Sequence, residues 1–460
     1  MKTIDLSGQP FHFIGIGGIG MSGLAYVLAK RRFRVSGSDI RPNHITERLQ
    51  SVGAHIFTQQ QASNLQIFKQ SSLPQIIWST AINNHNCEYK AAISHGFPLF
   101  HRSELLAALI SDYYSIAVSG THGKTTTSSL LGYLLLEAGL DPTIIVGGEV
   151  NAWEGNARLG EGKFLVAEAD ESDGSLTKHT PKIGVITNIE LDHPDHYQSL
   201  QQLISTFQTF ARQCELVVGC LDCETVREYI KPDIGYTLMD RPEADYWAQN
   251  IKYQGKESEA QIWERGEYLG KIRLQIPGQH NISNALAAIA VGRKLGLAFE
   301  TISDALAGFS GAKRRFEIRG EYRGAILVDD YAHHPSEVEA TLKAARVQAE
   351  QGCYQRIVAI FQPHRYTRTQ TFLAEFATAF RDADQVIITD IYGAGETNPN
   401  HLSGAQVAQA IEAHHPGGVV YHPEVQSLSS YLSKILQKGD LALFLGAGNL
   451  NQVIPELIFS

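Results

Sequence analysis

Cysteine, methionine and tryptophan are scarce in this chain of 460 residues, which contains five, three and four of them, respectively. An odd and sparse set of cysteines gives no disulfide framework and suggests a reducing cytoplasm. Cys220 and Cys223 have the spacing of a zinc-ligand pair, but no second pair or nearby histidine cluster completes a zinc site. We therefore interpret both cysteines as ordinary residues without a metal.

Long apolar runs are also missing, because none approaches the roughly 18 residues of a membrane-spanning helix. The first residues, Met1–Ser7, lead directly into an expected strand and lack the apolar segment of a secretory signal. The net charge of −9 disfavours a nucleic acid or an anionic membrane as the main partner. We expect a cytoplasmic protein, a monomer or a weak homodimer, with no nucleic-acid or membrane partner.

The strongest motif is the glycine loop Gly120–Thr126, which contains a Gly-Lys-Thr triplet. Tyr114–Val118 before it is apolar and predicts a buried strand, and Thr127–Leu135 after it predicts a helix. This order is typical of a phosphate-binding loop, in which backbone N–H groups and the helix N-terminus hold phosphate. We expect Lys124 to reach the β- and γ-phosphates and the Thr125 hydroxyl to hold Mg²⁺. The loop is shorter at its front than the standard motif.

A second glycine-rich turn, Gly15–Met21, lies between an expected strand at His12–Ile14 and a helix that runs to Lys30. The next expected strand ends in Asp39, about twenty positions after the last glycine, as in dinucleotide-binding folds. Taken alone, this pattern favours NAD, with Asp39 on a ribose hydroxyl. The glycines themselves establish only that a phosphate-bearing ligand can approach the backbone. An NAD-dependent oxidoreductase therefore remains an alternative, as does a nucleotide-binding regulatory protein without turnover.

Acidic residues follow two expected strands in the central part of the chain. Lys163–Ala167 runs into Glu168–Asp173, and Gly184–Asn188 runs into Glu190–His196. Because the carboxyl ends of parallel strands meet at one edge of a sheet, we expect phosphate loop, carboxylates and a histidine to lie there together. A phosphate-loop enzyme keeps its Mg²⁺ carboxylate at such an edge.

Other segments complete the predicted organisation. Thr143–Val146 predicts a strand that runs into Gly147-Gly148, a turn whose backbone a ligand can approach. Residues 246–276 alternate polar and apolar side chains and predict a small antiparallel sheet, followed by a helix through Arg293. Alternating strands and helices then return, with a helix expected at Thr371–Arg381. The expected strands of this last part are Ala325–Val328, Ile357–Phe361, Gln385–Thr389, Val419–Tyr421 and Leu441–Leu445.

The predicted fold class is α/β with three domains. Residues 1–110 form an N-terminal Rossmann-like sheet, and residues 111–318 form a central P-loop ATPase-like α/β domain with a small antiparallel sheet. Residues 319–460 form a C-terminal Rossmann-like sheet. Polar residues gather at the carboxyl ends of the strands in all three parts, which is where open α/β sheets bind ligands.

Together these motifs resemble the Mur ligase family over essentially the whole chain. The family's order of motifs is matched by Gly120–Thr126, Glu168–Asp173, Asp192-His193, His280–Asn284 and Asp329–Pro335. The run His364–Thr369 resembles the alanine-adding branch. The resemblance implies an ATP- and Mg²⁺-dependent ligase. Its substrates would be L-alanine and UDP-N-acetylmuramate, joined through an acyl phosphate in peptidoglycan precursor synthesis, with a first domain that binds UDP.

The resemblance also implies residue roles. Asn281 and Asn284 would contact adenine, Arg314 or Arg315 the phosphates, and Asp330 the ribose. The ATP-binding set is Gly120, Thr121, His122, Gly123, Lys124, Thr125, Thr126, Asn281, Asn284, Arg314, Arg315 and Asp330. The set that binds the UDP substrate is Gly15, Gly17, Gly18, Gly20, Met21, Ser38, Asp39, Ser79, Gly147 and Gly148.

Three smaller sets follow from the same resemblance. Tyr331, His333, Arg365 and Arg368 would bind alanine. Thr125, Glu168 and His193 would bind Mg²⁺ directly or through water. The catalytic set is Lys124, His193, His333 and Arg365. Other branches carry a carbamoylated lysine after the Asp-His motif, but residues 194–212 contain no lysine, which leaves the ligands of a second metal ion open.

Overall fold

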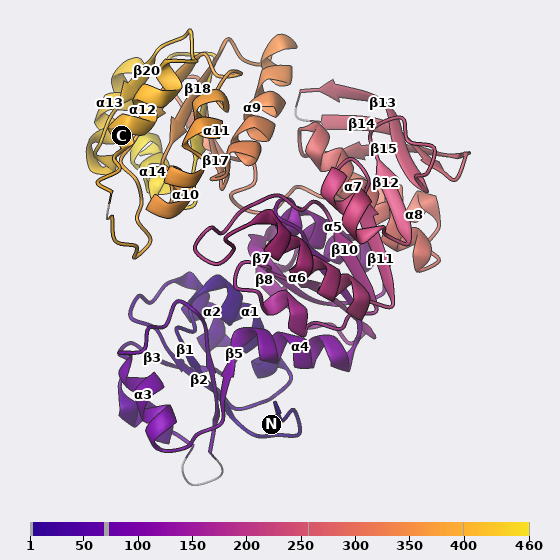
Figure 1. Ribbon diagram of the computed structural model, residues 1–460, viewed down its shortest axis with the longest axis vertical. Coiled ribbons are helices and arrows are strands. Elements are labelled where there is room, and N and C mark those ends of the chain that lie inside the picture. Colours follow the sequence, from indigo (N-terminus) through magenta and orange to yellow (C-terminus); the bar gives the residue numbers. More distant parts are fainter. Residues whose placement is uncertain (1–2, 69–72, 256, 399, 460) are drawn as a thin grey trace. The chain divides into compact units, whose positions relative to one another are not determined.

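The computed structural model describes residues 3–68, 73–255, 257–398 and 400–459 (Figure 1). Contacts group the chain into two units. The first consists of residues 1–189, 204–235 and 287–298, and the second of residues 190–203, 236–286 and 299–460. Among the helices of the described residues, none combines the length and apolar character that a membrane crossing requires.

The N-terminal part of the first unit is a parallel sheet in the order β3-β2-β1-β4-β5. Its central strand is fully buried, which fits an α/β sheet covered on both faces. The strands are β1 (Phe11–Ile14), β2 (Val35–Ser38), β3 (His55–Phe57), β4 (Gln75–Trp78) and β5 (Leu99–His101). The helices are α1 (Ile19–Lys30), α2 (His44–Ser51), η1 (Ala62–Gln66), α3 (Cys87–Ser94) and α4 (Arg102–Asp112).

A second sheet of the first unit has the order β11-β10-β6-β9-β7-β8, parallel except for the pair β7–β8. Strands β10, β6 and β9 are neighbours, so the three predicted strand ends do meet at one edge. The strands are β6 (Tyr114–Ser119), β7 (Thr143–Val150), β8 (Gly155–Arg158), β9 (Phe164–Glu168), β10 (Ile183–Ile186) and β11 (Leu216–Cys220). The helical elements are α5 (Lys124–Glu137), η2 (Asn151–Trp153), η3 (Ser175–Lys178) and η4 (Val226–Ile230), while α6 (Leu200–Gln213) begins in the second unit.

The predicted turn at Gly147-Gly148 is wrong. Both glycines lie inside β7, which continues to Val150, and its register against β8 shifts between Ile145 and Val150. A Cβ atom at Gly147 would come within 2.5 Å of the Glu168 carboxylate. The glycine therefore allows close approach to a neighbouring strand end rather than a reversal of the chain.

The second unit contains an antiparallel meander, as the alternation of residues 246–276 predicts. Its strands are β13 (Tyr246–Gln254), β14 (Glu257–Glu264) and β15 (Glu267–Leu274), and β13 also pairs in parallel with the end of β12 (Ile234–Thr237). The helices that follow are α7 (Gln279–Lys294) and α8 (Phe299–Gly308).

The C-terminal sheet of the second unit has the order β16-β17-β21-β18-β19-β20, with only β16 antiparallel. The strands are β16 (Glu317–Tyr322), β17 (Ala325–Asp330), β18 (Arg356–Phe361), β19 (Gln385–Ile388), β20 (Val419–Tyr421) and β21 (Asp440–Leu445). The helices are α9 (Pro335–Glu350), α10 (Tyr366–Thr371), α11 (Leu373–Thr378), α12 (Gly404–Glu412), α13 (Val425–Ile435), η5 (Leu450–Gln452) and α14 (Val453–Ile458).

Both faces of this C-terminal sheet are covered (Figure 1). Alternate residues of β18 enter opposite cores: Phe361 packs with side chains of α9, α11 and α12, and Ile360 with those of α13 and α14. The helix predicted at Thr371–Arg381 begins earlier and is broken at Phe372, whose φ is −108°. The first piece begins directly after Arg365, whose backbone N–H donates to Tyr392 O.

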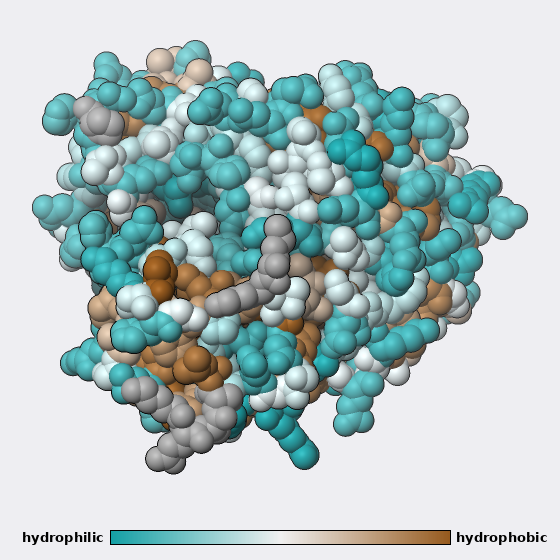
Figure 2. Space-filling model, turned by 60° about the horizontal axis from the view of Figure 1, so that its bottom comes forward, coloured by the Kyte–Doolittle hydropathy of each residue, from teal (hydrophilic) through white to brown (hydrophobic). Residues whose placement is uncertain are grey.

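Figure 2 shows one face of the molecule, on which hydrophilic side chains dominate and apolar ones form smaller groups. A few large apolar residues are well exposed, and Phe459 is the most exposed of them at 87%. The buried phenylalanines of the C-terminal sheet are the opposite case, because Phe361 has no exposed surface and lies 5.3 Å from the rings of Phe376 and Phe380.

We predict that Phe361→Ala destabilises the second unit by about 3–5 kcal/mol, because the truncated side chain leaves a cavity between β18 and α11. Phe459→Ala is the matched control and should change the free energy of unfolding by less than about 0.5 kcal/mol. Denaturant unfolding followed by tryptophan fluorescence and circular dichroism measures both. Similar losses in the two variants would contradict the packing described here.

Candidate active site

The phosphate-type loop of the first unit connects β6 to α5. Gly123 caps the helix with a φ of 80°, and Gly120 has a φ of 138°. The end of β10 holds the loop: Asn188 Oδ1 accepts from His122 N (2.8 Å), and Thr187 Oγ1 donates to His122 O (2.6 Å). A Cβ atom at Gly120 would lie 2.0 Å from Thr187 Oγ1, so only glycine fits this position.

Lys124 is the only charged residue of this loop, and its side chain folds back onto it. Its Nζ donates to Gly120 O (2.6 Å), Thr121 O (3.1 Å) and Glu171 Oε1 (2.8 Å). The side chains of Lys124 and Glu171 are 14% and 1% exposed. Burial by itself lowers the pKa of Lys124, but the carboxylates of Glu171 and Asp170 outweigh it and raise that pKa above its usual value. Burial raises the pKa of Glu171 to about 7 although Lys124 opposes the shift, while Lys124 itself remains a buried ammonium.

Glu171 lies in the acidic run predicted to surround the metal, but the sequence did not single it out. Four acids within six residues carry the same local signal, and only the fold shows which of them faces Lys124. Thr187 and Asn188, which anchor the loop backbone, were missed for a similar reason. Their only signal was two polar residues directly after a buried strand.

Glu168 and Thr125 of the predicted metal set lie together. Thr125 Oγ1 donates to Glu168 Oε1 (3.1 Å), and the N–H of Gly147 donates to Glu168 Oε2 (2.6 Å). A hydroxyl and a carboxylate at this sheet edge form the oxygen-rich donor set that Mg²⁺ prefers. Gly147, predicted to contact the UDP substrate, thus contacts the predicted metal ligand. His193, the third member of the set, belongs to the second unit, where its Nε2 lies 3.6 Å from Asp192 Oδ2.

The N-terminal glycine turn is held by the acid at the end of β2. The N–H of Gly17 donates to Asp39 Oδ2 (2.9 Å), and a Cβ atom at Gly17 would lie 2.8 Å from that oxygen. Ser38 is buried and donates to Glu88 (2.5 Å), so it contributes to the core below the turn. The predicted glycine turn and the predicted acid, Asp39, therefore lie in contact.

The other residues of the predicted UDP set differ in accessibility. Met21 is buried in the first turn of α1, and Ser79 follows β4 half-buried. Arg102, a residue that sequence reasoning missed, opens α4 beside the glycine turn, because a Cβ atom at Gly20 would lie 3.1 Å from its Nη1. Its Nη2 donates to Asp170 (2.9 Å), so one cation links the glycine turn to the acidic run.

The residues predicted to contact the nucleoside of ATP lie in the second unit. Asn281 and Asn284 are buried in the first turns of α7, where Asn281 Nδ2 donates to Pro277 O (2.6 Å) and Asn284 Nδ2 to Asn281 Oδ1 (3.2 Å). Asp330 ends β17 and accepts the N–H of Ala332 (2.8 Å). Burial raises the pKa of Asp330 to about 6.

Two predicted sets meet around Tyr331. The guanidinium carbons of Arg314 and Arg315 lie 4.9 and 5.3 Å from the centre of its ring. Arg314 Nη2 also donates to Gly446 O (2.7 Å), which fixes this arginine to the end of β21. The structure thus places residues predicted for ATP and for alanine in contact through cation–π interactions.

Two histidines lie next to this tyrosine. His333 Nδ1 is 2.8 Å from Tyr331 O, and the ring of His364 lies 5.9 Å from that of His333 and stacks on Tyr392. Burial lowers the pKa of His333 to about 4, although Glu337 opposes the shift. Burial, then His333, lowers the pKa of His364 to about 3. Both rings are therefore neutral at pH 7, and His364 had not been assigned a role.

The two arginines predicted to bind alanine form ion pairs with carboxylates of the Asp-His loop, the loop before α6 that carries Asp192 and His193. Arg368 Nε and Nη2 donate to the two oxygens of Asp192 (2.9 and 3.3 Å), and both side chains are 4% exposed. Burial by itself would raise the pKa of Asp192, but Arg368, then His193, holds it well below its usual range. Arg365 Nη1 donates to Asp195 (2.7 Å).

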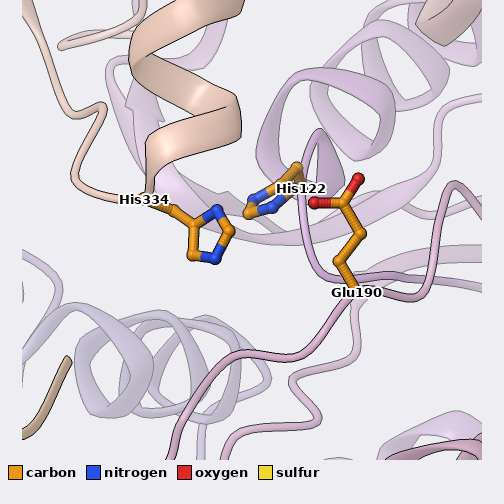
Figure 3. A group of neighbouring side chains, drawn as sticks. All are labelled: His122, Glu190 and His334. Atoms are coloured by element: carbon orange, nitrogen blue, oxygen red, sulfur yellow. The ribbon is translucent and has the colours of Figure 1, made fainter. Parts of the chain in front are cut away.

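The same loop is also bonded to the start of α9. Glu190 accepts from Ser336 Oγ (2.7 Å), and His334, the N-cap of α9, accepts from Ser336 N (3.3 Å). Figure 3 shows Glu190 on its loop and His334 at the start of α9. The loop before α6 is therefore bonded within the second unit to both Ser336 and Arg368.

The first unit holds a nucleotide-type loop with strand-end carboxylates, and the second unit separately holds a group of arginines and neutral histidines, as expected for a ligase of the α/β class. Known families agree with that class. "Mur ligase family, catalytic domain" matches residues 10–114, "Mur ligase middle domain" residues 118–292 and "Mur ligase, glutamate ligase domain" residues 314–448.

Full-length relatives are also similar. UDP-N-acetylmuramate–L-alanine ligase of Microcystis aeruginosa is 63% identical, with 100% of this chain and 97% of the relative covered. The ligase of the same name from Nostoc punctiforme is 62% identical, with 99% and 97% covered. The structure of UDP-N-acetylmuramate–alanine ligase from Thermotoga maritima superposes with a TM-score of 0.84 at 28% identity, covering 98% of each chain. The chain belongs to the Mur ligase family.

The family and the three-domain α/β fold expected from the sequence are thereby confirmed. The domain boundaries at residues 110 and 318 stay a prediction, and so do the roles of the individual site residues. None of the relatives described above is named as an oxidoreductase. The NAD alternative also gives no role to Lys124 and its carboxylates.

We predict that Glu171→Gln destabilises the first unit by about 3–5 kcal/mol, because it leaves the Lys124 ammonium buried without its nearest counter-charge. The double variant Lys124→Met/Glu171→Gln should regain most of that loss, since neither charge then remains. Thermal and denaturant unfolding of the two single variants and the double variant measure the coupling. Losses that simply add in the double variant would show that the two charges do not depend on each other.

Proposed function

We propose that this chain joins L-alanine to the lactyl carboxylate of UDP-N-acetylmuramate, with hydrolysis of ATP to ADP and phosphate. The product would be UDP-N-acetylmuramoyl-L-alanine, a peptidoglycan precursor. The observation that carries the proposal is the similarity to enzymes of that name, because it covers 99–100% of this chain. The geometry supports the same chemistry independently.

The first half-reaction needs charge neutralisation. A carboxylate is a poor electrophile, so it must first accept the γ-phosphoryl group of ATP as an acyl phosphate. Carboxylate and triphosphate repel each other, and the permanent ammonium of Lys124 supplies the compensating positive charge. Thr125 and Glu168 would hold Mg²⁺, which when bound neutralises further phosphate charge. The N–H groups of the loop and of the first turn of α5 bind and orient the phosphates.

The second half-reaction needs a neutral amine. The ammonium of free alanine must lose a proton before it attacks the acyl phosphate, and His333 and His364 are neutral at pH 7. Neither ring therefore adds a positive charge beside the amine, while their low pKa values make both of them weak bases. A guanidinium fork matches the carboxylate of the amino acid, so Arg365 is suited to orient alanine beside these rings.

The UDP group is expected to bind on the N-terminal glycine turn, away from the reacting carboxylate. Binding energy from such a remote group positions the reacting end without taking part in the chemistry. Asp39 fixes the backbone of that turn through Gly17, and Arg102 supplies a cation suited to a diphosphate. Membership in the Mur ligase family supports ATP as the phosphate donor.

The function is tested by measuring phosphate release against a panel of UDP-sugars and amino acids. The proposal predicts release only when ATP, UDP-N-acetylmuramate and an amino acid are all present, with L-alanine preferred. A requirement for NAD, or phosphate release independent of the UDP-sugar, would refute it. Mg²⁺ dependence is tested in the same assay with EDTA and added metal.

We predict that Lys124→Ala abolishes turnover and leaves binding of UDP-N-acetylmuramate within about twofold of the wild type, because the two loops lie on different sheets. Asp39→Ala is the complementary variant, and it should weaken the UDP-sugar by about tenfold or more while the KM for ATP stays nearly unchanged. Isothermal titration calorimetry and steady-state kinetics separate the two effects. An equal loss of UDP-sugar binding in both variants would contradict this division.

A further inference from the structure

The Asp-His loop and the arginine segment after β18 match each other residue by residue. Two acids, Asp192 and Asp195, are three positions apart, and so are the two arginines, Arg365 and Arg368. Each acid pairs with one arginine: Asp192 with Arg368 and Asp195 with Arg365. Both predicted carboxylate-binding residues thus already hold carboxylates of the protein itself.

The inner pair is fixed. Asp192 uses both oxygens on the Nε–Nη2 edge of Arg368, both side chains are 4% exposed, and Arg368 Nη1 faces His364 Nδ1 at 3.4 Å. Removing either partner would leave a buried charge without compensation. An incoming carboxylate could therefore displace Asp192 only at a large cost in free energy. Arg368 therefore serves to hold the loop and His364 in place.

The outer pair is different. The Asp195 side chain is 39% exposed and that of Arg365 is 33% exposed, and the Nη1 of Arg365 also lies 3.3 Å from Glu396. Glu396 is tied to the start of α10 through the N–H and hydroxyl of Thr367. Over residues 3–68, 73–255, 257–398 and 400–459, the structure gives the Asp195 carboxylate no hydrogen bond or ion pair other than the one to Arg365. Asp195 is thus the carboxylate that can leave Arg365.

We propose that Asp195 and the carboxylate of the incoming amino acid compete for the guanidinium of Arg365, so that Asp195 sets the affinity for the amino acid. This inference rests on the proposed function. The exchange replaces one carboxylate by another, so the charge around Arg365 is conserved, and the released Asp195 returns to solvent. An exposed ion pair is weak enough to be exchanged in this way.

The test compares Asp195→Asn with the wild type in steady-state kinetics. We expect the KM for L-alanine to fall about two- to fivefold, the range that an exposed ion pair supports, with kcat and the KM values for ATP and UDP-N-acetylmuramate nearly unchanged. Asp195→Glu retains the competing carboxylate and should keep the wild-type KM. Asp304→Asn, which removes an exposed acid of α8 in the same unit, controls for net charge.

Calorimetry of L-alanine binding, with UDP-N-acetylmuramate and a non-hydrolysable ATP analogue present, gives a readout without turnover and should show the same gain. In an Arg365→Lys background the effect of Asp195→Asn should disappear, because the shared partner is gone. The inference would be overturned if Asp195→Asn leaves the KM for L-alanine unchanged or raises it. It would also be overturned if Asp195→Asn lowers that KM equally in the Arg365→Lys background. If the wild-type enzyme releases no phosphate in response to alanine and the UDP-sugar, the proposed function is wrong, whatever the Asp195 variants show.

Discussion

The buried ammonium of Lys124 is the constraint on which the rest of the first unit's site depends. An ammonium that is mostly removed from water must be compensated, and Glu171 and two loop carbonyls do this within 3.1 Å. The loop can curve around the lysine only because Gly120 has a left-handed φ and no Cβ atom against Thr187. The order of strands β10, β6 and β9 then puts the Glu168 and Glu171 carboxylates beside the same loop. Charge, backbone conformation and sheet order thus support one another.

The second unit also compensates cationic side chains with carboxylates. Two guanidinium groups after β18 are balanced by acids of the loop before α6, one pair buried and one partly exposed. Burial is the largest cause that lowers the pKa values of the neighbouring His333 and His364, and Arg368 lowers both further, so both rings are neutral at pH 7. The unit therefore presents two uncharged imidazole rings next to its arginines. The exposed pair adds a place where affinity for an amino acid can be adjusted without disturbing the buried one.

Local patterns in the sequence predicted much of this arrangement. The strand Tyr114–Val118, the glycine loop and the following helix have strong short-range signals, and the alternation of residues 246–276 predicted the meander correctly. Gly147-Gly148 was mistaken for a turn because glycine signals both reversal and close approach. Only the position of Glu168 shows that close approach is the reason here.

The unpredicted parts are contacts between residues far apart in the chain. Lys124 and Glu171 are separated by 47 positions, and Asp192 and Arg368 by 176. No local periodicity contains that information. The resemblance to the Mur ligase family assigned Arg365 and Arg368 to one pocket, but it could not show that one arginine is locked in a buried pair while the other is exchangeable.

The central claim is that ATP phosphorylates the lactyl carboxylate at the edge of the sheet formed by β10, β6 and β9. Labelling the carboxylate of UDP-N-acetylmuramate with oxygen-18 tests it most directly, with mass spectrometry of the phosphate released in the complete reaction. The account predicts one labelled oxygen in each released phosphate and one retained in the new amide. Unlabelled phosphate, or label transferred to AMP, would contradict it.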